Sequence, residues 1–163
     1  MAKTQSPHTT VSGTGSLAAE LVQRLGDYLD QQKNICARLE KIADALPAID
    51  DAEAMREFAS TLPTLLRAVH AYEELRIFPA LLNNGPLLLA GTIERLKEEH
   101  ASDEDYADDV CLAIETYLIE QDRNRAESLS WMLRGFFENI RRHIAYEREH
   151  ILPLANQIGK PTL

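Results

Sequence analysis

Apolar residues recur at alternating steps of three and four along most of the chain. In residues 17–46, for example, Leu21, Leu25, Leu39 and Ile42 belong to one such series. This spacing places apolar side chains on one face of an α-helix, and over the whole chain it predicts four long helices. The expected ranges are 17–46, 51–82, 86–119 and 126–157.

Helix-ending residues separate these ranges. Pro47 follows the first helix, and Pro86 opens the third at a position where proline is favourable. Pro63 and Pro79 lie inside the second range and can kink it. Because the connections are short, consecutive helices should be antiparallel neighbours. We therefore expect an all-α fold, an up-down-up-down antiparallel four-helix bundle.

Length and composition suit one acidic domain. Residues 1–15 are polar and aperiodic, so we expect a disordered N-terminal tail followed by a bundle domain over residues 16–163. The net charge of −9 argues against nucleic acid as a partner. The sequence shows no apolar run that could cross a bilayer and no signal peptide, so we expect no membrane partner. Cys36 and Cys111 occupy apolar helix positions, which favours buried free thiols and a reducing cytoplasm.

Three of the five histidines are followed by glutamate four residues later, each on a different predicted helix. The pairs are His70 with Glu74, His100 with Glu104, and His143 with Glu147. Residues i and i+4 share one face of a helix, so each pair aims an imidazole and a carboxylate in one direction. Counting residues from the predicted turns puts the three pairs at the same height in the bundle.

A layer of buried histidines and carboxylates would be very costly without compensation, and metal ions supply that compensation. Helix-borne His and Glu are typical ligands of dinuclear iron or manganese sites in bundles. Alternatively, single pairs can face solvent as ordinary surface partners. Gln32, on the apolar face of the first helix, and His150, seven residues after His143, are further candidates for ligands or for residues that support them. Glu73 is an alternative to its neighbour Glu74.

Longer segments around these residues form recognisable motifs. They are Cys36-Ala-Arg-Leu-Glu-Lys-Ile-Ala-Asp-Ala-Leu-Pro, His70-Ala-Tyr-Glu-Glu-Leu-Arg-Ile-Phe-Pro-Ala-Leu, Glu98-Glu99-His100, and His143-Ile-Ala-Tyr-Glu-Arg-Glu-His-Ile-Leu-Pro-Leu-Ala. In order and spacing they resemble the four helices of the hemerythrin-like (HHE cation-binding) domain family, from about residue 17 onward.

The resemblance implies a non-haem site with two iron ions, oxo- or hydroxo-bridged, with manganese or zinc as other metals. Carried over by position, Glu74 and Glu147 would bridge, His70 would bind one ion, and His100 and His143 the other. Glu104 would complete the predicted set. Family members bind or sense O₂, NO or related small molecules, or sense iron, and a homodimer is an expected assembly.

Two positions depart from the family pattern. Gln32 stands where the family's first helix carries a histidine, and Glu104 stands where the third helix often carries a second one. The predicted site is therefore richer in carboxylate, which stabilises ferric iron and disfavours reversible oxygen storage. Two alternatives follow: an oxidative di-iron enzyme, such as a ferroxidase or a peroxide-consuming enzyme, and a bundle that has lost stable metal binding. Whether the protein is an enzyme stays open at this point.

Overall fold

A computed structural model describes residues 12–84 and 89–158, and this part of the chain contains helices and no strand. The elements in order are α1 (Ser12–Ala45), α2 (Ala52–Tyr72), the π-helical turn η1 (Glu73–Ile77), α3 (Phe78–Asn84), α4 (Leu89–Glu120), the 3₁₀ turn η2 (Arg123–Arg125), α5 (Ala126–Tyr146), the π-helical turn η3 (Glu147–Ile151) and α6 (Leu152–Ala155).

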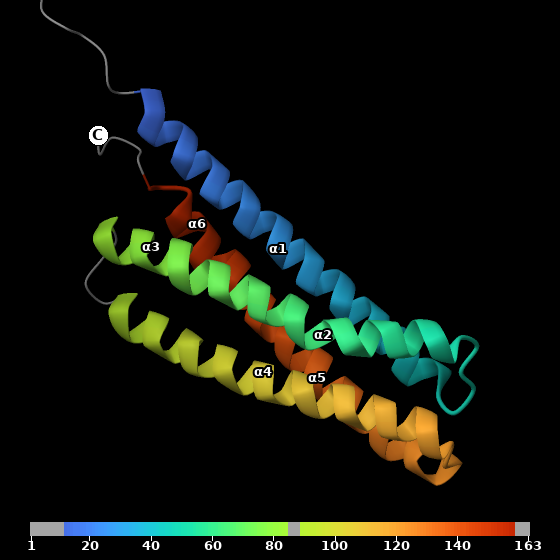
Figure 1. Cartoon of the computed structure of the whole chain (residues 1–163). Helices are drawn as coiled ribbons and strands as arrows, with labels where there is room; N and C mark the ends of the chain where they lie inside the picture. Colours follow the sequence, from blue (N-terminus) through green and yellow to red (C-terminus); the bar gives the residue numbers. More distant parts are fainter. Residues whose placement is uncertain (1–11, 85–88, 159–163) are drawn as a thin grey trace, which may run out of the picture.

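These elements combine into four long rods. Figure 1 shows α1, the continuous run α2–η1–α3, α4, and the continuous run α5–η3–α6 lying alongside one another. The most extensive packing joins α1 to α5, α2 to α4, and α4 to α5. The predicted all-helical fold is confirmed, and the four rods are consistent with a four-helix bundle. Its up-down-up-down order stays a prediction.

Helix boundaries follow the sequence signals closely, with one difference at the start. Asp51 caps α2, because its Oδ1 accepts a hydrogen bond from the Ala54 N–H at 2.9 Å. The first helix begins at Ser12 rather than near Leu17, so residues 12–15 of the expected tail belong to α1. The rest of that tail, residues 1–11, and the predicted turn residue Gly85 lie outside the described residues.

The apolar faces of the four rods meet in one core. Leu25, Leu62, Leu96 and Leu133 are each 0% exposed, one from each rod. Full burial of such a side chain contributes about 1.5–3 kcal/mol relative to leaving it in water. The buried Cys36 thiol also contributes a contact, since its Sγ donates to the Phe137 carbonyl at 3.6 Å and joins α1 to α5. None of the described helices is long and apolar enough to span a membrane.

Two rods contain a wider turn at the same height. In η1 the Phe78 N–H bonds to the Glu73 carbonyl, and in η3 the Leu152 N–H bonds to the Glu147 carbonyl. Both bonds span five residues instead of the four of an α-helix. Such single π turns are frequently found at functional sites, and these two begin with the glutamates described next.

Candidate metal centre

A cluster of polar side chains lies inside the apolar core. Each is at most 6% exposed, and together they come from all four rods: Gln32, His70, Glu73, His100, Asp103, His143 and Glu147. Isolated charges in such surroundings would be very unfavourable, so their partners decide what the cluster can do.

Four of these residues point ligand atoms at one place. One atom from each of Glu73, His100, His143 and Glu147 lies within 4.8 Å of the others. Nε2 of His100 is 3.2 Å from Oε2 of Glu73, and Nε2 of His143 is 3.5 Å from Oε1 of Glu147. His70 completes the group, since its ring stacks on that of His100 with centroids 3.9 Å apart. The site therefore joins the two π turns to α4 and α5.

The inward atoms of this group make no hydrogen bond of normal geometry with any described residue. This holds for Nε2 of all three histidines and for both carboxylate oxygens of Glu73 and Glu147. Oε1 of Gln32 is also buried without a hydrogen-bond partner among the described residues. Buried polar atoms almost always have a partner, so seven such atoms from five converging side chains form a group that could hold a metal ion.

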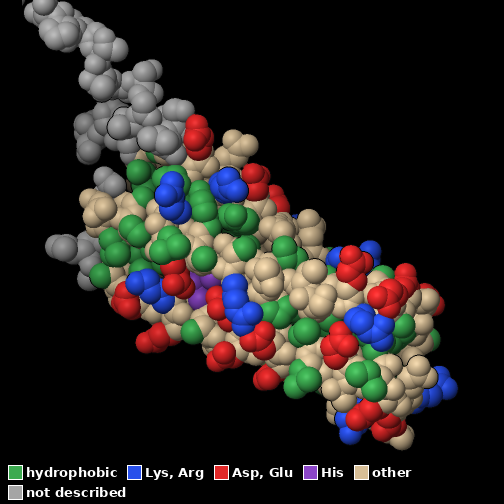
Figure 2. All heavy atoms as spheres, viewed as in Figure 1, with side chains coloured by type: hydrophobic (Ala, Val, Ile, Leu, Met, Phe, Trp, Pro, Cys, Tyr) green, Lys and Arg blue, Asp and Glu red, His purple; other side chains and the backbone are tan. Residues whose placement is uncertain are grey.

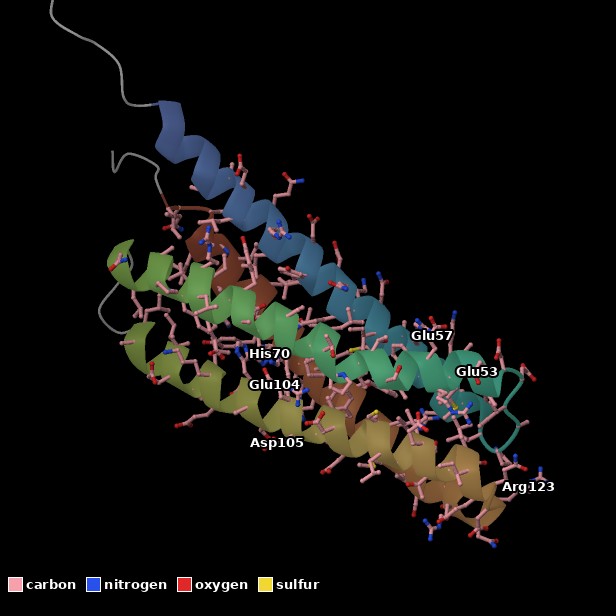
Figure 3. The ribbon with its side chains drawn as sticks, viewed as in Figure 1. Glu53, Glu57, His70, Glu104, Asp105 and Arg123 are labelled. Carbon is pink, nitrogen blue, oxygen red and sulfur yellow. The ribbon has the colours of Figure 1, made fainter. Side chains whose placement is uncertain are left out.

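The outer nitrogen of each histidine faces a carboxylate. Nδ1 of His70 is 2.9 Å from Oε1 of Glu104, and Nδ1 of His100 is 2.8 Å from Oε1 of Glu74. Figure 3 shows His70 and Glu104 adjacent to each other on facing rods. An imidazole that donates Nδ1–H to a carboxylate keeps the Nε2 lone pair free and correctly aimed, which is the usual arrangement behind a metal-binding histidine.

His143 has a looser version of the same support. Its Nδ1 lies 3.5 Å from Oε2 of Glu99 and 3.9 Å from Oδ2 of the buried Asp103. The other oxygen of Asp103 accepts a hydrogen bond from the Asn139 side chain. Carboxylates thus stand behind all three rings, while the ring edges that face the interior are free for a ligand.

Burial controls the protonation of the cluster. It raises the pKa of Glu73 well above its ordinary value, and the nearby Glu147 carboxylate raises it further. Burial, with His100 and His143 nearby, lowers the pKa of His70 to about 2, so this ring is neutral. Burial lowers the pKa of His143 too, but the close Glu147 carboxylate, 3.5 Å from Nε2, outweighs it, and the net shift is upward. A divalent cation would favour the ionised glutamates and the neutral imidazoles at once.

The structure divides the residues singled out in the sequence into three sets. His100, His143 and Glu147 lie in the inner group, and His70 stacks against it. Glu74 and Glu104 have side chains 35% and 28% exposed, and both contact the outer nitrogen of a histidine from the facing rod. Gln32 is buried, whereas the His150 side chain is 50% exposed and lies against Tyr146. That the six residues of the sequence analysis bind metal stays a prediction.

Sequence reasoning placed Glu73 second to Glu74, whereas the structure places Glu73 in the inner group. A second signal was available. The segment Ala71-Tyr72-Glu73 is followed by Ile77 and Pro79, and the same residue types recur in the same spacing at Ala145-Tyr146-Glu147, Ile151 and Pro153. Aligning the two segments on their prolines pairs Glu147 with Glu73. The supporting residues Asp103 and Glu99 carried no comparable signal.

The donor set fits a metal ion. Imidazole nitrogen and carboxylate oxygen together suit iron, manganese and zinc, and a site without thiolate does not favour copper(I). The seven unpartnered inward atoms are the observation on which this fit rests. Figure 2 shows a small area of histidine among acidic and basic side chains on this face.

Comparison with known families gives one match. The model of the family described as Hemerythrin HHE cation binding domain matches residues 17–155, which includes every residue of the inner group. Comparisons with curated proteins and with solved structures give no match. The match covers most of the chain and agrees with the helical fold and the buried His/Glu group. The chain belongs to the hemerythrin HHE cation-binding domain family.

Proposed function

We propose that this protein is a non-haem di-iron protein that binds or senses a small ligand, O₂ or NO, or iron itself. The family membership supports a cation at the cluster. The observation that carries the proposal is the convergence of three Nε2 atoms and two buried glutamates without hydrogen-bond partners among the described residues. Two ions, rather than one, suit a cluster with four unpartnered carboxylate oxygens. The up-down-up-down order of the rods and a reducing cytoplasmic setting belong to the same proposal.

The residues have distinct roles in this proposal. Glu73 and Glu147 come from opposite rods and each offers two oxygens, so they can be shared between two ions. His100 and His143 would hold one ion, and His70 would hold the other. Gln32 takes the place of a first-helix ligand through its free Oε1. Bound iron supplies an electron-rich, oxidisable centre to which a small ligand can attach.

The surrounding residues hold this site ready. Glu104 and Glu74 fix the rings of His70 and His100 from outside, and Arg67 in turn contacts Glu104, with Nε 3.5 Å from Oε2. The Phe78 ring also stacks on the His100 ring, with centroids 5.7 Å apart. These contacts leave the rings little freedom and keep bulk water away from the inward atoms.

An oxidative enzyme at the same site is the second candidate. Five glutamates lie in or directly behind the cluster, and negative charge favours the higher oxidation state of iron. Such a site should oxidise ferrous iron or consume peroxide rather than carry oxygen reversibly.

The experiment is metal analysis of protein purified without a metal-affinity tag, followed by visible spectra under anaerobic and aerated conditions. We expect up to two iron ions per chain and a spectrum that changes on exposure to air. Turnover of added Fe²⁺ or peroxide would move the enzyme to first place. Protein that is metal-free as isolated and takes up no Fe²⁺ would refute both candidates.

A further inference from the structure

The two π turns share a sequence as well as a shape. Each begins with an inward glutamate, and each is followed by an exposed proline six residues after that glutamate, Pro79 after Glu73 and Pro153 after Glu147. Neither proline belongs to the core, so packing of their own rings does not explain their position.

A third copy of the spacing behaves differently and serves as an internal comparison. Glu57 precedes Pro63 by six residues, but α2 stays α-helical there. Glu57 is exposed while Leu62, five residues later, is 0% exposed. This difference in exposure is expected for an α-helix. Five residues of an α-helix turn about 140° beyond one full turn, so the side chains at positions i and i+5 point to different sides.

In η1 the two positions lie on the same side, and in η3 the residue five positions after the buried Glu147, Leu152, is partly buried. Glu73 and Phe78, also five residues apart, are both 0% exposed, and Phe78 stacks on the His100 ring. A turn that closes on five residues brings i and i+5 together. The wide turn therefore lets one rod present both the carboxylate and the aromatic ring that faces His100. An α-helical turn would direct one of them away.

Proline favours the wide turn through its backbone. In an α-helix its ring collides with the carbonyl four residues earlier and its missing N–H leaves that carbonyl without a partner. For Pro79 that carbonyl belongs to Leu75, and for Pro153 to Glu149, both inside the π turns. Proline thus destabilises the α-helical form of the two turns that begin with Glu73 and Glu147. Pro63 shows that proline alone does not set the turn. At the two sites burial of Ile77 and Ile151 acts with it, whereas the matching Thr61 is exposed.

We propose that Pro79 and Pro153 are positioning residues that stabilise the two π turns and so hold Glu73 and Glu147 toward the metal site before any ion binds. The inference rests on the proposed function where metal affinity is measured. The π turns themselves can be observed in metal-free protein.

The test compares Pro79→Ala and Pro153→Ala with Pro63→Ala, which removes a proline from the same rod as Pro79 at a place with no π turn. Co²⁺ is the probe, because its visible absorption reports both affinity and coordination. We expect each of the first two variants to bind Co²⁺ about 10-fold or more weakly with an altered spectrum. Pro63→Ala should bind like the natural protein, even if its melting temperature falls.

Crystal structures of the metal-free variants give the second readout. Loss of the Phe78-to-Glu73 or Leu152-to-Glu147 hydrogen bond in the corresponding variant is expected. If both variants keep their π turns and bind Co²⁺ normally, the inference is overturned. If the natural protein binds no Co²⁺ or Fe²⁺, the proposed function fails, and the structures of the variants still decide the role of the prolines. The two substitutions lie in different rods, so one remains informative if the other prevents folding.

Discussion

The imidazole ring of His70 lies face to face with that of His100, with planes 2° apart and centroids 3.9 Å apart. The two rings come from different rods, and each receives its supporting carboxylate from the rod of the other, Glu104 for His70 and Glu74 for His100. This crossed arrangement places two glutamates that have the spacing of metal ligands beside the outer nitrogens of the rings. It also gives each residue of the site a separable role.

The first prediction separates Glu73 from Glu74. Glu73→Gln should abolish binding of at least one metal ion, because it removes a carboxylate of the inner group. Glu74→Gln should keep the stoichiometry and weaken affinity by about 10- to 100-fold, the usual effect of changing an outer partner. Isothermal titration with Fe²⁺ under anaerobic conditions measures both. Glu149→Gln, an exposed position in η3, is the matched control. Greater loss in Glu74→Gln than in Glu73→Gln would contradict this assignment.

A second prediction concerns the stability of the metal-free protein. Because the pKa of Glu73 is raised in the fold, its contribution to stability is present below the unfolded pKa near 4.5 and is lost as pH rises through the folded pKa. At pH 8 Glu73→Gln should therefore raise the free energy of unfolding, by about 1–4 kcal/mol. The difference from the natural protein should shrink as the pH falls toward 5. Urea unfolding at several pH values in the presence of a chelator tests this. A difference that grows on acidification would disprove it.

Glu104 provides a third test. Its carboxylate accepts from Nδ1 of His70 and lies outside the inner group. Glu104→Ala should weaken metal binding about 10- to 100-fold, whereas Glu104→Gln, which keeps an acceptor oxygen, should recover much of the loss. Asp105→Ala is the control, since Asp105 is exposed and Figure 3 places it on the outer side of α4. Equal effects of Ala and Gln at position 104 would mean that charge, and not ring orientation, matters there.

The fourth prediction addresses Gln32. Its side chain is 1% exposed and its Oε1 has no hydrogen-bond partner in the described part of the chain. Gln32→His should tighten binding of the second equivalent of Fe²⁺, because imidazole is the stronger ligand. Chelator competition monitored by absorbance measures the change. Asn34→His adds a histidine at an exposed position of the same helix and should have no effect. Unchanged affinity in Gln32→His would place Gln32 outside the site.

The fold was largely predictable because its signals are local. The steps of three and four in residues 17–46 and the cap at Asp51 need no tertiary information. The start of α1 at Ser12 was missed, because Ser, Gly and Thr are weak helix formers and the apolar pattern begins later.

The site was predictable as a layer but not atom by atom. His70 shares a helix face with both its i+3 and i+4 neighbours, so spacing alone cannot choose between Glu73 and Glu74. The choice depends on the π turn, which needs a proline and buried partners from other rods, and on Glu74 finding His100 across the interface. Such contacts between distant segments are absent from a local pattern.

The inner group draws Glu73 from one half of the chain and His100, His143 and Glu147 from the other. An ion bound there would connect positions as far apart in sequence as Glu73 and Glu147, as a disulfide does in a secreted protein. The chain would have to release the ion before it could unfold fully. Cross-linking lowers the entropy of the unfolded chain most when the loop that it closes is long. Metal loading should therefore lengthen the time that the folded chain survives heat or proteolysis, and the metal-free form should be the shorter-lived one.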